Sequence, residues 1–174
     1  MNIIVETQSM TAATGKLKIA GHVFDCTLGR SGVIAPEDKK EGDGKTPLGT
    51  YPLRLLLYRA DRMEKPDTKL PVQILTAKTG WCEDAAHPDY NKQVTLPHHA
   101  VCDRMMREDY LYDMTVIIGY NDAPPVAGKG SAIFMHLARH EFTPTAGCVG
   151  LKKDDLLTVL KLCDAGTRIT ILPP

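Results

Sequence analysis

Residues 143–151 read TPTAGCVGL, in which Cys148 follows a turn-forming Thr-Pro-Thr stretch and a glycine. Cysteine is most often a small buried hydrophobe, so packing in a core is one interpretation of this residue. The other is a nucleophilic thiol, which needs a base or a positive charge close by. His136 ends the apolar run SAIFM and could be that base if the chain turns back between the two residues. Spacing alone leaves both interpretations open.

The rest of the chain is dominated by short apolar runs rich in β-branched residues and separated by turn residues, which predicts a mainly β fold. Only two stretches have helical spacing, so we expect one or two helices to support the strands. At 174 residues the chain fits a single domain over 1–174. The predicted strands are residues 2–7, 16–20, 22–28, 50–57, 71–75, 114–120, 131–137 and 167–172, the predicted helices 99–109 and 152–162, and the long loops 29–49 and 80–100.

The charge and the cysteine content limit the classes of binding partner and the cellular compartment that we expect. Twenty-one basic residues balance 21 acidic ones without a basic run, which indicates neither a nucleic-acid nor a membrane-surface partner. The sequence shows no leader and no membrane span, so we expect a cytoplasmic protein. Five cysteines without a C-x-x-C pair argue against a disulfide framework or a zinc ribbon. We therefore interpret four of them as packing residues: Cys26, Cys82, Cys102 and Cys163.

Two motifs together carry a family resemblance. HLARHEFTPTAGCVGL, residues 136–151, resembles the active-site segment of the YkuD-type L,D-transpeptidase family. GDGKTPLGTY, residues 42–51, is similar to the same family's motif on an early strand, and the two occur in the family's order. The resemblance covers most of the chain and implies the β-sandwich or barrel of these enzymes with one or two supporting helices. The chain is also similar to a small, leaderless branch that resembles cytoplasmic L,D-carboxypeptidases.

The resemblance also implies the catalytic roles. Cys148 would attack a peptide carbonyl to form a thioester, and His136 would take and return its proton. The backbone carbonyl of Leu137 would orient the imidazole, so that no carboxylate is needed for this role. The amides of Gly147 and Cys148 would hold the oxyanion. No cofactor and no metal is expected.

The candidate substrate-binding residues are Thr145, Trp81, Arg104 and His140. Thr145 stands where the family often has serine. Trp81, in a long polar loop, could form a substrate wall or roof the core, and Arg104 could hold a substrate carboxylate or be a solvated helix charge. His140 could replace a family histidine, which is Ala146 here, or be an exposed loop residue. Lys45 and Thr46 are expected to shape a loop.

The expected partners are peptidoglycan stem peptides or muropeptides, cleaved between an L-configured centre, usually diaminopimelate, and a terminal D-Ala. With water as acceptor the protein would be an L,D-carboxypeptidase of cell-wall recycling, which we expect first. With an amine it would be an L,D-transpeptidase that makes cross-links or exchanges D-amino acids. β-Lactams of the carbapenem type are candidates for acylating Cys148.

Two other classes stay open. HLARH places His136 and His140 at the i, i+4 spacing of two zinc ligands on a helix, as in a metallohydrolase, although the glutamate of H-E-x-x-H is missing. The chain could also be a non-catalytic muropeptide-binding module, in which Cys148 would be dispensable.

Overall fold

Alternating apolar residues make the first strands into the wall of a barrel. In the computed structural model, which describes residues 1–174, Ile3 and Val5 of β1 (Asn2–Thr7) and Leu17 of β2 (Thr14–Ile19) are fully buried, while the residues that alternate with them are more exposed. This period of two is what a sheet with one covered face requires.

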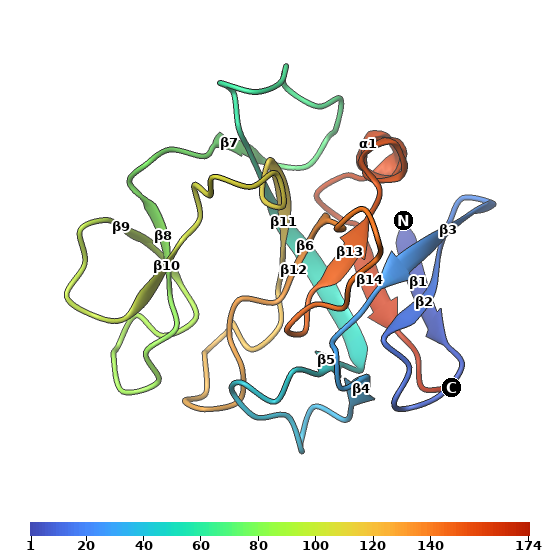
Figure 1. The fold of residues 1–174 in the computed structure, drawn as a ribbon, viewed down its shortest axis with the longest axis horizontal. Coiled ribbons are helices and arrows are strands. Elements are labelled where there is room, and N and C mark those ends of the chain that lie inside the picture. The colour runs from blue at the N-terminus through green and yellow to red at the C-terminus, as the bar shows by residue number, and fades with distance from the viewer.

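The largest sheet closes on itself (Figure 1). Its nine strands run in the order β11 (Met114–Ile118), β12 (Phe134–Leu137), β13 (Val149–Leu151), β3 (His22–Thr27), β2 (Thr14–Ile19), β1 (Asn2–Thr7), β14 (Arg168–Ile171), β6 (Gly49–Tyr58) and β7 (Val72–Ile74). A further pairing of β11 with β6 joins the two ends, and β7 extends from the closed part. The predicted mainly β fold of barrel type is therefore confirmed.

Two small sheets lie outside the barrel. The strands β8 (Thr79–Cys82), β9 (Gln93–Thr95) and β10 (Cys102–Arg104) form an antiparallel sheet at the left of Figure 1. The strands β4 (Val33–Ile34) and β5 (Thr46–Pro47) pair in parallel. Both of the predicted long loops, 29–49 and 80–100, therefore contain short strands.

The helix α1 (Lys153–Leu162) confirms the prediction for residues 152–162. It buries Leu156, Val159 and Leu160 in the barrel core, and acidic residues in its first turn suit the helix dipole. It is ten residues long, and no helix in the structure has the length and apolarity needed to cross a membrane.

The predicted helix over residues 99–109 is wrong. Cys102, Asp103 and Arg104 form β10 instead and pair with Cys82, Trp81 and Gly80 of β8. A ladder with a distant strand satisfies the same backbone groups that a helix would satisfy locally, and the helical spacing of the apolar residues did not decide between them. Val101, which the helix would have begun to bury, is 71% exposed.

One buried side chain, that of Thr46, anchors the motif at residues 42–51. The Oγ1 atom of Thr46 accepts a hydrogen bond of 2.8 Å from the backbone N–H of Gly29, and Thr46 is fully buried. A Cβ at Gly29 would lie only 2.3 Å from the carbonyl oxygen of Gly44, so this close approach requires glycine. Thr46 thus shapes the loop, as expected, and fixes the segment around Gly29.

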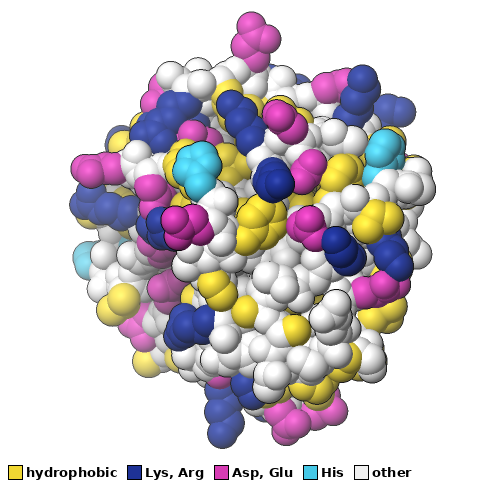
Figure 2. Space-filling view, turned by 45° about the vertical axis from the view of Figure 1, so that its right-hand side comes forward, with side chains coloured by type: hydrophobic (Ala, Val, Ile, Leu, Met, Phe, Trp, Pro, Cys, Tyr) yellow, Lys and Arg dark blue, Asp and Glu magenta, His cyan; other side chains and the backbone are white.

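On the face shown in Figure 2, basic and acidic side chains are interspersed. This distribution agrees with the equal numbers of the two charges in the sequence.

Candidate active site

Parallel pairing of β12 and β13 brings Cys148 and His136 to one cavity. Met135 is the register partner of Val149, so Cys148, which directly precedes β13, lies beside Phe134. Side chains two apart on a strand share a face, which places His136 on the face of Phe134. Both Cys148 and His136 line a cavity of about 220 Å³.

A tight turn holds the backbone of Cys148. The hydroxyl of Thr145 donates to the carbonyl oxygen of Cys148 at 2.7 Å and accepts from the N–H of Gly147 at 3.0 Å. Gly147 has a φ of 142°, and a Cβ there would lie 2.9 Å from the carbonyl oxygen of Lys45. The first motif therefore packs directly against the second.

These contacts bear on the expected oxyanion hole. The Gly147 N–H is already donated to Thr145, whereas the N–H of Cys148 has no hydrogen-bond partner within the protein. The amide of Cys148 is therefore available to a developing oxyanion in this conformation. Thr145 lines the cavity, and its contact with a substrate stays a prediction.

The imidazole of His136 is oriented by its own backbone. Nδ1 lies 2.8 Å from the carbonyl oxygen of Leu137, and because a carbonyl only accepts, Nδ1 must carry the proton. Nε2 is then left unprotonated and able to act as a base. Burial lowers the pKa of His136 to about 4, against the smaller effect of the Leu137 carbonyl. The imidazole is therefore neutral at pH 7.

The thiol of Cys148 is also neutral at rest. It is 7% exposed, donates to the carbonyl oxygen of Ala132 at 3.2 Å and accepts from the N–H of Phe134 at 3.4 Å. Burial raises its pKa to about 12, and the Phe134 N–H offsets only part of this effect. Thiol and imidazole thus form no ion pair before a substrate arrives.

The cavity shared by Cys148 and His136 has a cationic wall. Arg107 and Arg139 line it. The Nε and Nη2 atoms of Arg107 donate to the two carboxylate oxygens of Asp109 at 2.9 and 2.8 Å, which leaves Nη1 without a hydrogen bond. The same guanidinium lies 5.3 Å from the ring centroid of Tyr112, which in turn packs against His136. A guanidinium held in this way is preorganised for a carboxylate.

On its other side Cys148 faces an acidic cavity of about 120 Å³, lined also by Glu41, Glu83 and Lys39. Burial, followed by the charges of Asp103 and Glu41, raises the pKa of Glu83 to about 7. Cys148 therefore lies between a cavity lined by two arginines and one lined by two glutamates and a lysine.

Three sequence-predicted residues lie away from these cavities. Trp81 is 7% exposed, donates from Nε1 to Asn91 Oδ1 at 3.0 Å and packs edge-on against Phe134, so it belongs to the core beneath the nucleophile. Arg104 is exposed on β10 and lines neither cavity beside Cys148. His140 lines a separate cavity of about 320 Å³ with Tyr110. Any contact of these residues with a substrate stays a prediction.

Sequence reasoning missed Arg107, Tyr112 and Glu83 at the site. Arg107 lies only three residues after Arg104, and the wrong helix obscured which of the two faces the nucleophile. Glu83 follows Trp81 and Cys82 in the predicted long loop 80–100, and the two acidic residues there, Glu83 and Asp84, were the available signal.

The pairing of His136 with His140 that suggested a metallohydrolase does not form. Residues 134–137 are a strand, so the two histidines do not share a helix face. His136 lines the cavity of Cys148 and His140 does not.

A barrel that presents a thiol and an imidazole to one cavity has the side chains that cysteine-dependent enzymes use. The family model for the YkuD L,D-transpeptidase catalytic domain matches residues 3–171. Because this match spans nearly the whole chain, the protein belongs to the YkuD family of L,D-transpeptidase catalytic domains. No match was found among the curated proteins.

Two solved structures are similar to the chain. L,D-transpeptidase 1 from Mycobacterium tuberculosis has a TM-score of 0.40 and 13% identity, covering 98% of this chain and 58% of the other. The helical cell shape determining protein Pgp2 from Campylobacter jejuni has a TM-score of 0.45 and 16% identity, covering 98% of this chain and 47% of the other. The chain thus spans about half the length of these solved chains.

The neutral resting pair predicts how Cys148 reacts with iodoacetamide. Because the thiol pKa is about 12, the alkylation rate should rise about tenfold per pH unit between about pH 7 and pH 10, without a plateau. Peptide mapping by mass spectrometry separates Cys148 from the other four cysteines. A rate that levels off near neutral pH would instead show a thiolate–imidazolium pair at rest.

Proposed function

We propose that the protein is an L,D-carboxypeptidase that removes the terminal D-Ala from peptidoglycan tetrapeptide stems. The observation that carries this proposal is the shared cavity of Cys148 and His136, in which Arg107 presents a free guanidinium edge. Membership of the L,D-transpeptidase family supports the scissile bond, between an L-configured centre and a D-residue.

The chemistry follows from the two neutral groups. Nε2 of His136 takes the proton as Cys148 Sγ attacks the carbonyl carbon, and the Cys148 N–H stabilises the oxyanion. Collapse breaks the peptide bond, leaves a thioester on Cys148 and passes the proton from Nε2 to the departing amine. Water, deprotonated by the same nitrogen, then attacks the thioester and regenerates the thiol.

We base the proposed orientation of the substrate in the two cavities beside Cys148 on the position of His136. His136 must reach the departing amine, so D-Ala belongs in the cavity that His136 lines, the one with Arg107 and Arg139. In D-Ala the carboxylate is one carbon from that amine, and a guanidinium fork suits it. The diaminoacyl part then lies toward Glu83 and Glu41, whose charges suit its ammonium group.

The same cationic wall favours water over a cross-linking amine. The acceptor enters where D-Ala has left, between His136 and the guanidinium groups of Arg107 and Arg139. An incoming side-chain ammonium is repelled there, whereas water is neutral. A free D-amino acid brings its own carboxylate, so exchange is the transpeptidase reaction that the site would best accept. All five cysteines are free thiols, which suits recycling in the cytoplasm.

Product analysis tests the reaction. We expect a diaminopimelate-containing disaccharide tetrapeptide to yield tripeptide and free D-Ala, detected by mass spectrometry, with the same products when a D-amino acid is added. Cys148→Ala should abolish turnover. Cross-linked dimers or exchanged stems would make the protein a transpeptidase. An intact tetrapeptide under all conditions would contradict the proposed substrate, and unchanged function in Cys148→Ala would favour a binding module.

Two arginines three residues apart provide a matched test of the carboxylate site. Arg107→Gln should raise KM for the tetrapeptide about tenfold to a hundredfold, because it removes a charge-assisted hydrogen bond. Arg104→Gln makes the same change on an exposed strand and should alter KM less than about twofold. A large effect of Arg104→Gln alone would return the carboxylate site to the residue that the sequence suggested.

The raised pKa of Glu83, about 7, predicts the pH dependence of substrate binding. Below that pH the carboxyl is protonated and no longer attracts an ammonium group, so KM for the diaminopimelate stem should rise as the pH falls. In Glu83→Gln the KM should be high and independent of pH in this range. A tetrapeptide whose third residue lacks the side-chain amine is the control. An equal pH dependence with both substrates would contradict this role of Glu83.

A further inference from the structure

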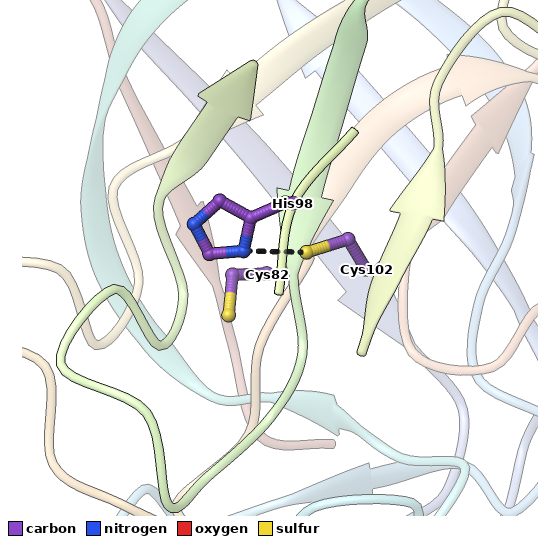
Figure 3. Close-up of side chains that lie close together, drawn as sticks. All are labelled: Cys82, His98 and Cys102. Carbon is purple, nitrogen blue, oxygen red and sulfur yellow. Dashed lines mark hydrogen bonds between the residues drawn. The ribbon is translucent and has the colours of Figure 1, made fainter. Parts of the chain in front are cut away.

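Two cysteines and a histidine meet on the small sheet outside the barrel. Cys82 of β8 and Cys102 of β10 are register partners, and the hydrogen bond from Glu83 N–H to the Val101 carbonyl shows that they form a non-hydrogen-bonded pair. Side chains of such pairs are the closest in an antiparallel sheet. His98 approaches from the preceding loop, and one of its ring nitrogens and the two sulfur atoms all lie within 4.8 Å of one another (Figure 3).

The distance between two of the donor atoms matches that expected around a tetrahedral metal ion. The distance between His98 Nδ1 and Cys102 Sγ is 3.5 Å. Metal bonds of about 2.3 Å to sulfur and about 2.0 Å to nitrogen, at a tetrahedral angle, separate the two donor atoms by about 3.5 Å. In Figure 3 the imidazole and the Cys102 sulfur face each other beside Cys82.

The protonation of His98 also fits. Nδ1 accepts a hydrogen bond of 3.2 Å from the N–H of Ala100, so this nitrogen carries a lone pair, as a metal ligand must. Nε2 lies 3.4 Å from Oδ2 of Asp89. A carboxylate behind the imidazole is the outer partner that commonly fixes the ring of a metal-bound histidine. The cluster therefore has both the ligands and a supporting residue.

We propose that Cys82, Cys102 and His98 bind one zinc ion, with Asp89 orienting the imidazole and a water molecule completing the tetrahedron. Two thiolates and an imidazole are a ligand set that selects zinc over magnesium or calcium. Binding releases the two thiol protons to solvent and replaces the contact between Nδ1 and the Ala100 amide. Cys102 and His98 are only partly buried, so the ion can enter from solvent. The site is independent of the proposed hydrolysis.

Metal titration of the reduced, chelator-treated protein tests this site. We expect one Co²⁺ per chain with a thiolate-to-cobalt charge-transfer band in the near ultraviolet, and displacement of Co²⁺ by Zn²⁺. Zn²⁺ should also raise the Tm. Competition with a chromophoric chelator gives the Kd for Zn²⁺. Absence of the charge-transfer band, or of one-to-one binding, would overturn the proposal.

The Kd for Zn²⁺ in variants of the proposed ligands and of control residues tests where the ion binds. Cys102→Ser should weaken Zn²⁺ binding at least about a hundredfold, and Asp89→Asn, a surface change that leaves all three ligands, about tenfold. His99→Ala, at the exposed neighbouring histidine, and Cys148→Ala should leave Kd unchanged. Binding that survives Cys102→Ser, or that is lost in Cys148→Ala, would overturn the assignment. So would a Cys82–Cys102 disulfide in the purified protein that, once reduced, yields no metal binding.

Discussion

The buried hydrogen bond from the Gly29 amide to Thr46 Oγ1 anchors the segment that holds the turn before Cys148, although both residues are far from Cys148 in sequence. The segment around Gly29 also exchanges two backbone hydrogen bonds with Thr145, one from Arg30 N–H and one to the Leu28 carbonyl. Thr145 then fixes the backbone on both sides of Gly147. Losing any of these buried partners would leave a polar group unpaired, at a cost of about 1–3 kcal/mol. The two sequence motifs are therefore one structural unit.

Burial explains why the thiol and the imidazole beside this unit are both neutral. Desolvation raises the pKa of Cys148 and lowers the pKa of His136, so both groups are neutral. The thiol keeps its proton and donates a hydrogen bond to the Ala132 carbonyl oxygen. In the proposed reaction, a substrate in the cavity brings a carbonyl carbon that the thiol attacks, and the negative charge that develops on the carbonyl oxygen meets the free Cys148 amide. Activation of the thiol in that proposed reaction is therefore tied to substrate binding.

Local sequence patterns correctly predicted the strands and the helix whose formation depends on residues close together in the chain. The β-branched runs located the barrel strands, and the leucine spacing of residues 152–162 located α1, since both elements present one apolar face to the same core. The pairing of Cys102 with Cys82 depends on residues 20 positions apart, and no local pattern records it. Gly80, on the same strand as Cys82, leaves room for the Leu96 side chain, because a Cβ there would lie 2.7 Å from it. The motifs could indicate Cys148 and His136, but Arg107 and Glu83 join them only through this small sheet.

One loop system thus supplies both charged walls of the site. Glu83 directly follows β8 and Arg107 lies three residues after β10, so the pairing of these two strands sets the separation of the acidic and cationic surfaces around Cys148. The cluster of Cys82, His98 and Cys102 ties the same two strands together. The backbone of Cys148 is held by a different segment, the turn at Thr145, whose hydroxyl donates to the Cys148 carbonyl oxygen. The turn that holds the Cys148 backbone and the strands that carry the charged residues of the two cavities are therefore different segments of the fold, and they meet where Trp81 of β8 packs against Phe134.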